Sequence, residues 1–599
     1  MALKLLMGNE AIAHGAVEAG VQVAAAYPGT PSSEILGTLA GMARANEFYA
    51  EWSVNEKVAL EIAAGASYAG ARALAAMKQV GLNVASDPLM SLAYIGVKGG
   101  LVLVVADDPG PHSSQTEQDT RRFAQFAKLP VLDPADPREA KEMAKWAFEL
   151  SEKLLLPVIL RPTTRTCHAC QDVFIEDGPG ERRQTAGFVK SPNWVIFPSL
   201  SARKHIWLNG QQETARKIFE QSPFNQLTIK ENSAYGVIAC GVSYNYVQEA
   251  LLLAGLEASV LKIGTPYPLP HSDVLELLKH AEKVLVIEEQ EPVVEDQVIS
   301  LAWRHRLSAG ISGKNDSLVP REGEFNVDRV KTFIEKFFKT SPAAQETAPL
   351  PELPLRPPVL CAGCPHRASF FAFKEAAKDK DVIFTGDIGC YTLGAMPPLR
   401  AADTCLCMGA SITIATGLHH AEPGRRQVAF LGDSTFFHTG IPGLINAVHN
   451  QADITIVILD NSTTAMTGHQ SHPGLSRTAT GSSAKSVDIA GLVKACGVEF
   501  VREVDPNDLK AAMAAASEAL SYPGLSVVIM KRECVALAKK GRPYAVNQEI
   551  CVECGACLEE LGCPAMGKAG GRPEISASCT GCGVCAQICP VEAITEVLS

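Results

Sequence analysis

CVECGACLEELGCP at residues 551–564 and CTGCGVCAQICP at residues 579–590 are the stretches that decide the fold at the end of this chain. Each run has three cysteines separated by two residues, then a fourth cysteine followed by proline. Three thiolates at this spacing wrap one corner of an iron–sulfur cubane, and the fourth ligates the other cluster of a pair. The runs therefore predict a small ferredoxin-like domain at residues 546–599 with two [4Fe–4S] clusters.

In crossed ligation, the fourth cysteine of each run binds the cluster of the other run, and this divides the cysteines into two sets. The first set is Cys551, Cys554, Cys557 and Cys589, and the second is Cys563, Cys579, Cys582 and Cys585. Cys563 departs from the usual spacing, because two extra residues precede it. Two zinc sites would also use eight cysteines, but the repeated triplets followed by Cys-Pro favour clusters, which form an electron relay when they are close together.

The composition is that of a globular protein with several domains. Of 599 residues, 47% are apolar and 20% are charged, and the net charge of -11 disfavours a nucleic-acid surface. The sequence has no apolar run long enough to predict a membrane span, and its N-terminus lacks the features of a signal peptide. We therefore expect a cytoplasmic protein, in which clustered thiols ligate metal rather than form disulfides.

The rest of the chain predicts a multidomain α/β architecture with parallel sheets. Short apolar runs alternate with alanine-rich stretches of helical character, such as Val54–Lys78. The predicted strands are Leu101–Ala106, Leu156–Leu160, Tyr235–Gly241, Lys283–Ile287, Val382–Thr385, Gln427–Leu431, Ile454–Leu459 and Leu525–Met530. Continuous apolar strands belong to parallel sheets covered on both faces, where sites form at the carboxyl ends of strands.

Polar residues follow two of these strands directly. Gly432-Asp433-Ser434 follows one strand, and Asp460-Asn461-Ser462-Thr463 follows another. Asp433 and Asn461 are 28 positions apart, and a carboxylate and an amide oxygen that converge there suit Mg2+. Gly432 allows close approach of the backbone, and a following helix N-terminus favours phosphate. Asp-Asn after a strand is also a common turn, so the pattern alone leaves both interpretations open.

This pattern resembles the GDG…N motif of thiamine-diphosphate enzymes. The resemblance implies that Asp433, the Asn461 side chain and the Thr463 backbone carbonyl bind Mg2+. It also implies that Gly432 and Ser434 belong to the binding site for thiamine diphosphate. Ser434 stands where the motif has its second glycine.

Three further segments resemble the diphosphate-binding half of 2-oxoacid:ferredoxin oxidoreductases. They are CAGCPHR at 361–367, GDIGC at 386–390 and CMGASI at 407–412. The resemblance implies that Ile388, Gly389, Cys390 and Met408 bind the cofactor. Cys390 is either beside the thiazolium or a small buried hydrophobe. Cys361 and Cys364 are alternatively a zinc or third-cluster pair, which no nearby second Cys-x2-Cys supports, and binding at Cys167 and Cys170 is also open.

The N-terminal block resembles the pyrimidine-binding half of the same family. YPGTPSSE at 27–34 matches the family's YPxTPSSE motif and implies that the Thr30 hydroxyl contacts the substrate carboxylate. Glu56, followed by GASYAG and Arg72, resembles the family's acidic residue followed by GAxxAGxR. Thiamine enzymes use one buried carboxylate to hydrogen-bond the aminopyrimidine and promote its imino form. Glu56 is the candidate for this carboxylate, and Glu61 is the competing position.

A loop beginning at Asp107 follows a predicted strand and is placed to line a substrate pocket. His112 in this loop either meets substrate or is a solvated histidine.

Together the motifs resemble the large (alpha) subunit of indolepyruvate:ferredoxin oxidoreductases over nearly the whole chain. The implied domains are a pyrimidine-binding domain at 1–165, a connecting region at 166–232, a middle transketolase-C-terminal-like α/β domain at 233–341, a Pro-rich linker at 342–358, a diphosphate-binding domain at 359–545 and the ferredoxin-like domain at 546–599.

The resemblance also implies a reaction and partners. An arylpyruvate (indolepyruvate or phenylpyruvate) and coenzyme A give an arylacetyl-CoA, CO2 and reduced ferredoxin. A separate small (beta) subunit supplies a domain that this chain lacks, in a hetero-oligomer such as α2β2. Nucleic acid and membrane are not expected partners.

Three alternatives remain open from the sequence. The same chemistry could act on pyruvate, a branched-chain 2-oxoacid or 2-oxoglutarate. The chain could be a non-catalytic electron-transfer subunit, or a non-oxidative thiamine decarboxylase with structural clusters.

Overall fold

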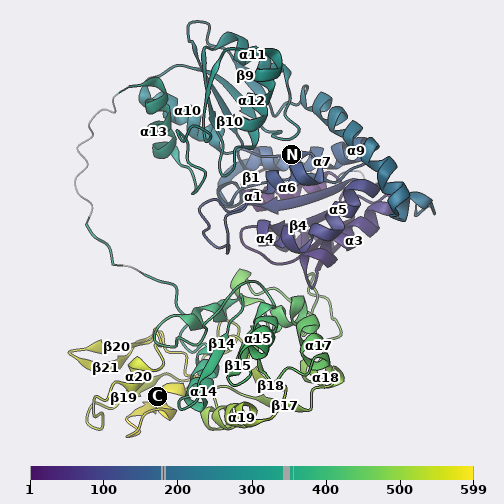
Figure 1. Cartoon of the computed structure of the whole chain (residues 1–599). Coiled ribbons are helices and arrows are strands. Elements are labelled where there is room, and N and C mark those ends of the chain that lie inside the picture. Colours follow the sequence, from purple (N-terminus) through teal and green to yellow (C-terminus); the bar gives the residue numbers. More distant parts are fainter. Residues whose placement is uncertain are drawn as a thin grey trace. The chain divides into compact units, whose positions relative to one another are not determined.

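The computed structural model describes residues 2–176, 178, 180, 184–185, 187–340, 351–354 and 356–597. The chain forms two compact units, Met1–Pro349 and Leu350–Ser599 (Figure 1). Both units are α/β with parallel sheets, as predicted. Among the described residues, none of the helices has both the length and the apolar character needed to cross a membrane.

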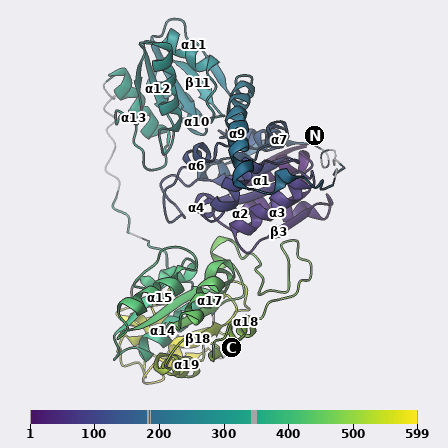
Figure 2. The same cartoon turned by 45° about the vertical axis from the view of Figure 1, so that its right-hand side comes forward.

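The first unit contains a six-stranded parallel sheet in the order β3-β2-β4-β5-β7-β6. Its strands are β2 (Val23–Ala26), β3 (Tyr49–Trp52), β4 (Ala73–Lys78), β5 (Leu101–Ala106), β6 (Val131–Leu132) and β7 (Val158–Leu160). The helices are α1 (Gly8–Glu18), α2 (Ser33–Ala43), α3 (Glu56–Tyr68), α4 (Gln79–Val84), α5 (Ser86–Ile95), α6 (Thr120–Ala127) and α7 (Pro137–Leu154). Helix α1 packs against α2 and α7 (Figure 2).

The predicted helix Val54–Lys78 is wrong in its second half. Helix α3 ends at Tyr68, and residues 73–78 form the buried strand β4. Gly70 follows with a φ of 90°, a conformation that glycine adopts without strain and that ends the helix. Because β4 is buried on both faces, its alanines show no alternation, and the stretch is hard to distinguish from a helix by pattern.

The region 166–232, predicted as a connection between domains, contains regular structure. Strand β8 (Cys170–Ile175) follows the short helix α8 (Thr164–His168) and pairs antiparallel with β1 (Ala2–Met7). After η1 (Pro192–Trp194) comes α9 (Pro198–Phe219), a helix of 22 residues that packs against α5. Only Leu200, Leu208, Ala215 and Phe219 of α9 are buried, so its apolar period is too weak to read from the sequence.

A second sheet completes the first unit, with five strands in the order β13-β12-β10-β11-β9. The strands are β9 (Gln226–Thr228), β10 (Tyr235–Cys240), β11 (Ser259–Ile263), β12 (Lys283–Ile287) and β13 (Gly310–Ser312), and β9 is antiparallel to β11. One apolar core lies under α10 (Ser243–Ala254) and α13 (Val327–Phe338), and the other under α11 (Ser272–His280) and α12 (Val293–His305).

The second unit contains a five-stranded parallel sheet in the order β14-β15-β16-β18-β17. The strands are β14 (Val382–Thr385), β15 (Arg426–Gly432), β16 (Thr455–Asp460), β17 (Phe500–Val504) and β18 (Ser526–Lys531). The longer helices are α14 (Pro365–Ala376), α15 (Ala410–Ala421), α17 (Ile441–His449), α18 (Ile489–Ala495) and α19 (Leu509–Ser521). Short helical turns are η2 (Cys390–Ala395), α16 (Asp433–Thr435), η3 (Phe436–Gly440) and η4 (Ala465–Thr467).

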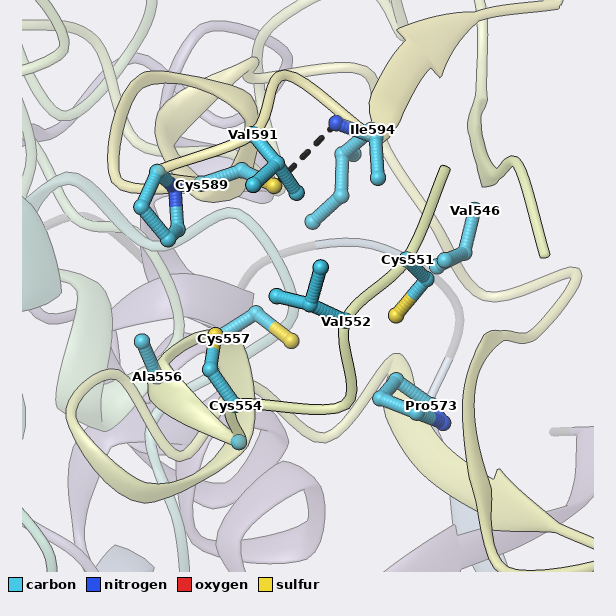
Figure 3. A pocket seen from close by; sticks show the side chains of 13 residues that line it. Val546, Cys551, Val552, Cys554, Ala556, Cys557, Pro573, Cys589, Val591 and Ile594 are labelled. Atoms are coloured by element: carbon cyan, nitrogen blue, oxygen red, sulfur yellow. Dashed lines mark hydrogen bonds between the residues drawn. The ribbon is translucent and has the colours of Figure 1, made fainter. Parts of the chain in front are cut away.

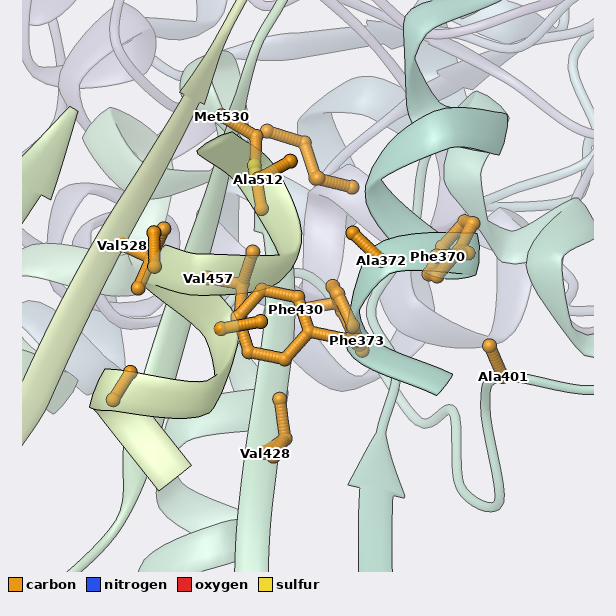
Figure 4. Close-up of a cluster of buried hydrophobic side chains, with 14 of the residues drawn as sticks. Phe370, Ala372, Phe373, Ala401, Val428, Phe430, Val457, Ala512, Val528 and Met530 are labelled. Carbon is orange, nitrogen blue, oxygen red and sulfur yellow. The ribbon is translucent and has the colours of Figure 1, made fainter. Parts of the chain in front are cut away.

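Aromatic packing fixes α14 on this sheet. Phe370 and Phe373 of α14 lie with their ring centroids 4.8 and 5.5 Å from that of Phe430 on β15 (Figure 4). Val457 and Val528 of the neighbouring strands belong to the same buried cluster. The residues just before α14 and in its first turn, CAGCPHR, are therefore held at a defined place beside the sheet.

The last segment forms the expected small cysteine-rich domain. It has β19 (Tyr544–Val546), α20 (Ala556–Glu559), β20 (Met566–Ala569), β21 (Arg572–Ile575), α21 (Val584–Gln587) and β22 (Ile594–Glu596), with the antiparallel pairs β19–β22 and β20–β21. Ala368 and Phe371 of α14 pack in one buried cluster with Leu561 and Val584 of this domain. The predicted Pro-rich linker spans 342–358, of which 342–350 and 355 lie outside the described residues.

Candidate active site and cluster sites

Asp433 and Asn461 lie at the carboxyl ends of adjacent strands. Gly432, at the end of β15, is in register with Leu459 of β16, so the two following segments emerge side by side. Asp433 is 2% exposed and Asn461 is 6% exposed. The Ser434 hydroxyl accepts a hydrogen bond from Thr464 at 2.9 Å, which ties the two segments together.

Asp433 belongs to a buried acidic pair. Its Oδ2 lies 3.1 Å from Nε2 of His472, and its Oδ1 accepts the Ser434 amide at 2.7 Å. Burial opposes ionisation of Asp433, but its contact with His472 and its hydrogen bonds with Ser434 and Asp460 together hold the pKa of this carboxyl below its usual value. Burial, and then the charge of Asp433, raises the pKa of Asp460 to about 6. A divalent cation beside both carboxylates would relieve this repulsion.

His366 is a site residue that the sequence analysis did not single out. Its Nε2 lies 3.3 Å from Nδ2 of Asn461, whose Oδ1 accepts the Thr463 amide at 3.2 Å. Burial lowers the pKa of His366 to about 4, so the ring is neutral at neutral pH. Its position in the CAGCPHR motif was the available signal. His472, by contrast, follows no motif in the sequence.

Asp387 anchors the loop that follows β14. Its Oδ1 accepts the amides of Ile388 at 2.7 Å and Gly409 at 3.0 Å, and its Oδ2 accepts the Ser411 amide at 3.1 Å. Burial raises the pKa of Asp387 to about 6. The carboxyl group thus joins the GDIGC segment to the start of α15, a structural role that the sequence analysis missed.

Tyr391 organises the predicted cofactor-binding residues around it. Its hydroxyl donates to the Ile388 carbonyl at 2.8 Å and lies 2.8 Å from the Thr435 hydroxyl. A Cβ atom at Gly389 or Gly432 would come within 2.3 or 2.6 Å of the Tyr391 ring, so both positions need glycine. The predicted residue Met408 is half-buried, and its carbonyl accepts a hydrogen bond from the Thr439 hydroxyl at 2.5 Å.

Cys390 lies among other cysteines. Burial, and then the charges of Cys534 and Cys361, raise the pKa of Cys390 to about 11. Burial raises the pKa of Cys364 to about 12, with additional effects from Cys361 and Cys390. Cys361, Cys364, Cys390 and Cys534 thus interact electrostatically, but within the described residues they form no group that closes around a metal ion. The sequence analysis sought a second Cys-x2-Cys, whereas Cys390 and Cys534 come from separate segments.

The eight cysteines of the C-terminal domain line two separate pockets. One pocket is lined by Cys551, Cys554, Cys557 and Cys589, together with apolar residues (Figure 3). The second pocket is lined by Cys563, Cys579, Cys582 and Cys585. This division is the one that crossed ligation predicts, and apolar pockets with four thiols fit two cubane clusters.

Two further observations concern these pockets. The Ala593 amide donates to the Cys589 sulfur at 3.2 Å, the dashed line in Figure 3. As the side chains are placed, no three His, Cys, Asp or Glu groups within the described ranges close around a metal ion.

Glu56 and Thr30 lie in the first unit. Glu56 is 6% exposed and begins α3, whose Asn55 cap accepts the Val58 amide at 2.9 Å. Its carboxylate lies against Gly81, where a Cβ would come within 2.6 Å of Oε1. The competing Glu61 is exposed and pairs with Lys57 at 2.5 Å, an arrangement typical of a surface helix. Thr30 follows β2, and its carbonyl accepts from Ser113 at 3.0 Å.

Lys78 is a third candidate residue in the first unit. The sequence pattern had predicted it at the end of a helix. It ends β4, and its side chain lies along Gly29, at 3.0 Å from where a Cβ would stand. Its Nζ donates to Gln115 at 3.3 Å. Burial lowers the pKa of Lys78, and the charges of Glu56 and Asp108 oppose that effect. A half-buried cation therefore lies beside the turn that carries Thr30 and interacts electrostatically with Glu56.

Other candidates of the first unit have partners of their own. Arg72 forms a buried ion pair with Glu152 at 2.8 Å, which is a structural contact. His112 lies 3.1 Å from Glu324, and its side chain is 50% exposed. Cys167 is buried and Cys170 is exposed on β8.

Comparisons with known proteins agree with this geometry. Residues 14–215 match the family described as "Pyruvate flavodoxin/ferredoxin oxidoreductase, thiamine diP-bdg". Residues 387–530 match "Thiamine pyrophosphate enzyme, C-terminal TPP binding domain", and residues 575–595 match "4Fe-4S binding domain". The fold and the site therefore define a thiamine-diphosphate-dependent 2-oxoacid:ferredoxin oxidoreductase.

The particular family follows from near-full-length relatives. Indolepyruvate oxidoreductase subunit IorA of Pyrococcus horikoshii is 44% identical over 99% of this chain and 97% of its own length. The proteins of the same name from Thermococcus kodakarensis and Methanothermobacter thermautotrophicus are each 45% identical over 98% of this chain and 96% of their own length. This chain belongs to the IorA family of indolepyruvate oxidoreductase subunits.

More distant similarity covers parts of the chain. The 2-oxoglutarate synthase subunit KorB of Archaeoglobus fulgidus is 31% identical over 30% of this chain and 70% of its own length. A solved 2-oxoglutarate:ferredoxin oxidoreductase from Magnetococcus marinus covers 55% of this chain and 65% of its own, with 18% identity and a TM-score of 0.45.

Proposed function

We propose that this chain catalyses the oxidative decarboxylation of an arylpyruvate, such as indolepyruvate or phenylpyruvate. Coenzyme A takes up the acyl group, and the products are an arylacetyl-CoA, CO2 and two reduced ferredoxins. The observation that carries the proposal is the buried acidic pair Asp433–Asp460 beside Asn461, in the same unit as two four-cysteine pockets. The arylpyruvate comes from the names of the relatives.

The residues at the strand ends would hold Mg2+ and the diphosphate. Asp433, the Asn461 side chain and the Thr463 carbonyl supply oxygen ligands, which Mg2+ prefers. Gly432 and Ser434 would lie against the diphosphate, and Ile388, Gly389, Cys390 and Met408 would line the cofactor site. When bound, thiamine diphosphate supplies a carbanion that attacks the keto carbon and holds the electrons left by decarboxylation.

In the first unit, Glu56 would hydrogen-bond the aminopyrimidine and favour the tautomer that removes the C2 proton. Thr30 and Lys78 would bind the carboxylate of the 2-oxoacid, because a hydroxyl and a cation are good partners for it.

Electrons would leave through the two cysteine sets of the C-terminal domain. Two electrons per turnover require two one-electron steps, which [4Fe–4S] clusters perform. A small (beta) subunit would complete the assembly, as the word "subunit" in the relatives' names suggests, for example as an α2β2 hetero-oligomer.

An anaerobic assay tests the proposal. The chain is co-expressed with its small partner, and thiamine diphosphate, Mg2+, coenzyme A and a viologen dye are added. We expect coenzyme A-dependent dye reduction that is fastest with indolepyruvate or phenylpyruvate. Faster reduction with 2-oxoglutarate or pyruvate would show that this 2-oxoacid, and not an arylpyruvate, is the substrate. Aldehyde release without dye reduction would indicate a non-oxidative decarboxylase.

Variants of the first unit sharpen this assay. Glu56→Gln should retain iron and bound cofactor but lose turnover. The exposed Glu61→Gln on the same helix is the matched control, and it should turn over normally. Near-normal turnover in Glu56→Gln would refute the role of this carboxylate.

A further inference from the structure

Arg367 is a buried arginine that the proposed chemistry does not use. It lies in the first turn of α14, in the CAGCPHR segment, and is 5% exposed. The packing of Phe370 and Phe373 on the sheet fixes this turn. The place of the guanidinium is therefore set by the core of the second unit and not by a mobile surface.

The guanidinium donates only to backbone carbonyls. Nη1 donates to Leu561 at 2.6 Å and Gly562 at 2.8 Å, and Nη2 donates to Leu360 at 2.7 Å and Cys361 at 3.4 Å. Nε is buried without a hydrogen-bond partner. No carboxylate of the described residues forms an ion pair with Arg367. A buried charge without a counter-charge is costly, so a negative group is expected beside it.

The groups that interact electrostatically with the guanidinium are thiols. Leu561 and Gly562, which accept from Nη1, directly precede Cys563. The guanidinium interacts electrostatically with Cys563 most strongly, and then with Cys364 and Cys582. Cys563 and Cys582 line the second cysteine pocket, which also reaches Gly363 of the CAGCPHR segment. Arg367 therefore lies behind the turn that carries one ligand of this set.

The first cysteine set has a different surrounding. Neither pocket is lined by a charged side chain besides its cysteines, so the difference lies behind the lining, where Arg367 contacts the turn before Cys563. Arg572 is the cation paired with Glu553 near the first set, and its side chain is 54% exposed. Its charge is therefore already matched and is screened by water.

We propose that Arg367 is the buried counter-cation of the cluster bound by Cys563, Cys579, Cys582 and Cys585, and that it raises the reduction potential of this cluster above that of the other. A cluster with four thiolates gains one negative charge on reduction, and a nearby buried cation stabilises the reduced state. The same position puts this cluster next to the segment that carries His366, the neighbour of Asn461.

The inference rests on one part of the proposed function, namely that each of the two cysteine sets holds a [4Fe–4S] cluster. The test is an anaerobic redox titration of the reconstituted full chain with dithionite, followed by EPR, with iron and sulfide analysis. A Cys551→Ser variant assigns the signals, because it removes a ligand of the first set only. No substrate is used, so failure to turn over does not affect the result.

Arg367→Gln removes the charge and Arg367→Lys keeps it. In Arg367→Gln, the ratio of reduced to oxidised second cluster at the wild-type midpoint should fall about tenfold, which is about 59 mV for one electron. Arg367→Lys should shift the ratio by less than about threefold, and the first cluster should not shift in either variant. The matched control Arg572→Gln should leave both midpoints unchanged.

The possible outcomes distinguish an electrostatic role of Arg367 from a purely structural one. An unchanged midpoint of the second cluster in Arg367→Gln overturns the proposal, as does an equal shift in Arg367→Lys. Loss of the second cluster's iron in both variants would make Arg367 a structural clamp and also overturn it. Loss in Arg367→Gln alone, with the wild-type midpoint retained in Arg367→Lys, supports it. Absence of cluster signals in the unmodified chain would defeat the proposed function instead.

Discussion

Both units place buried charged residues after parallel strands, but they balance these charges differently. In the first unit, Arg161 binds Asp107 at 2.7 Å and Asp133 at 2.8 Å, where β5, β6 and β7 end. Arg121 binds Asp119 at 2.7 Å and Glu288, just after β12, at 2.8 Å. In the second unit, the buried carboxylates of Asp433 and Asp460 lie together, and Asp433 contacts His472.

The difference teaches how to separate a structural charge cluster from a binding site. Carboxyl ends of parallel strands are the usual place for ligands. Where arginines already pair with each carboxylate, the network holds two sheets together and needs no ligand. Where two carboxylates repel each other in a buried site, a cation is expected to complete it.

The largest effect should come from removing an acidic residue of the second unit. Asp433→Ala should abolish binding of Mg2+ with thiamine diphosphate, and with it turnover, because a proposed ligand is lost. Without cofactor, its stability should change little, since removing one of two adjacent carboxylates relieves repulsion. Titration calorimetry and thermal unfolding measure the two properties. The exposed Asp381→Ala, whose carboxylate pairs with Arg425, is the control, and tight cofactor binding by Asp433→Ala would contradict the assignment.

The corresponding change in the first unit should affect stability. Arg161→Met leaves Asp107 and Asp133 buried and unpaired, which should cost about 3–5 kcal/mol of unfolding free energy. Urea unfolding measures this loss. Arg122→Met is the matched control, because Arg122 pairs with Asp296 at a site that is 39% exposed and should contribute less than about 1 kcal/mol. Equal losses of unfolding free energy in the two variants would show that the buried ion pairs stabilise the fold no more than an exposed pair does.

Glu289 gives the first unit a pH dependence. Burial raises the pKa of this carboxyl from 4.5 to about 7, and its Oε2 has no hydrogen-bond partner. The folded state therefore holds a proton that the unfolded state has lost between these values, and stability falls as pH rises from about 4.5 to 7. Glu289→Gln should reduce this fall by at most about 3 kcal/mol. Urea unfolding of both proteins across this pH range measures the effect. If the unfolding free energy of Glu289→Gln falls with pH as steeply as that of the unmodified chain, the prediction is wrong.

The sequence predicted the elements whose pattern is local. The predicted strands Leu101–Ala106, Lys283–Ile287 and Val382–Thr385 have the bounds that the structure shows. The eight cysteines line two pockets in the division that the sequence predicted. Short spacing holds three cysteines of each set together, and the fourth comes from the other run, as the ferredoxin pattern implies. Strand β4 was missed because alanines buried on both faces have no period.

Contacts between distant segments could not be predicted in the same way. His472 meets Asp433 across 39 positions, and Cys534 joins Cys361 and Cys390 from a separate loop. Arg367 reaches a turn 194 positions away. Each of these contacts depends on how helices and sheets pack, and a single sequence carries no local signal for that packing.

Lys78 is a cation of the first unit that could bind substrate, because it takes no part in the buried ion pairs of Arg161 and Arg121. It lies at the end of β4, in the same sheet as Arg161, yet among the described residues no carboxylate is within ion-pair distance of it. If its ammonium binds the carboxylate of the 2-oxoacid, Lys78→Met should raise KM about 10- to 100-fold, as expected for a hydrogen bond to a charged group. Steady-state kinetics with the complete enzyme measure this change. Lys98→Met is the control, because Lys98 donates to the Gly187 carbonyl at 2.8 Å. A KM in Lys78→Met that matches the control would place Lys78 with the structural charges of the first unit.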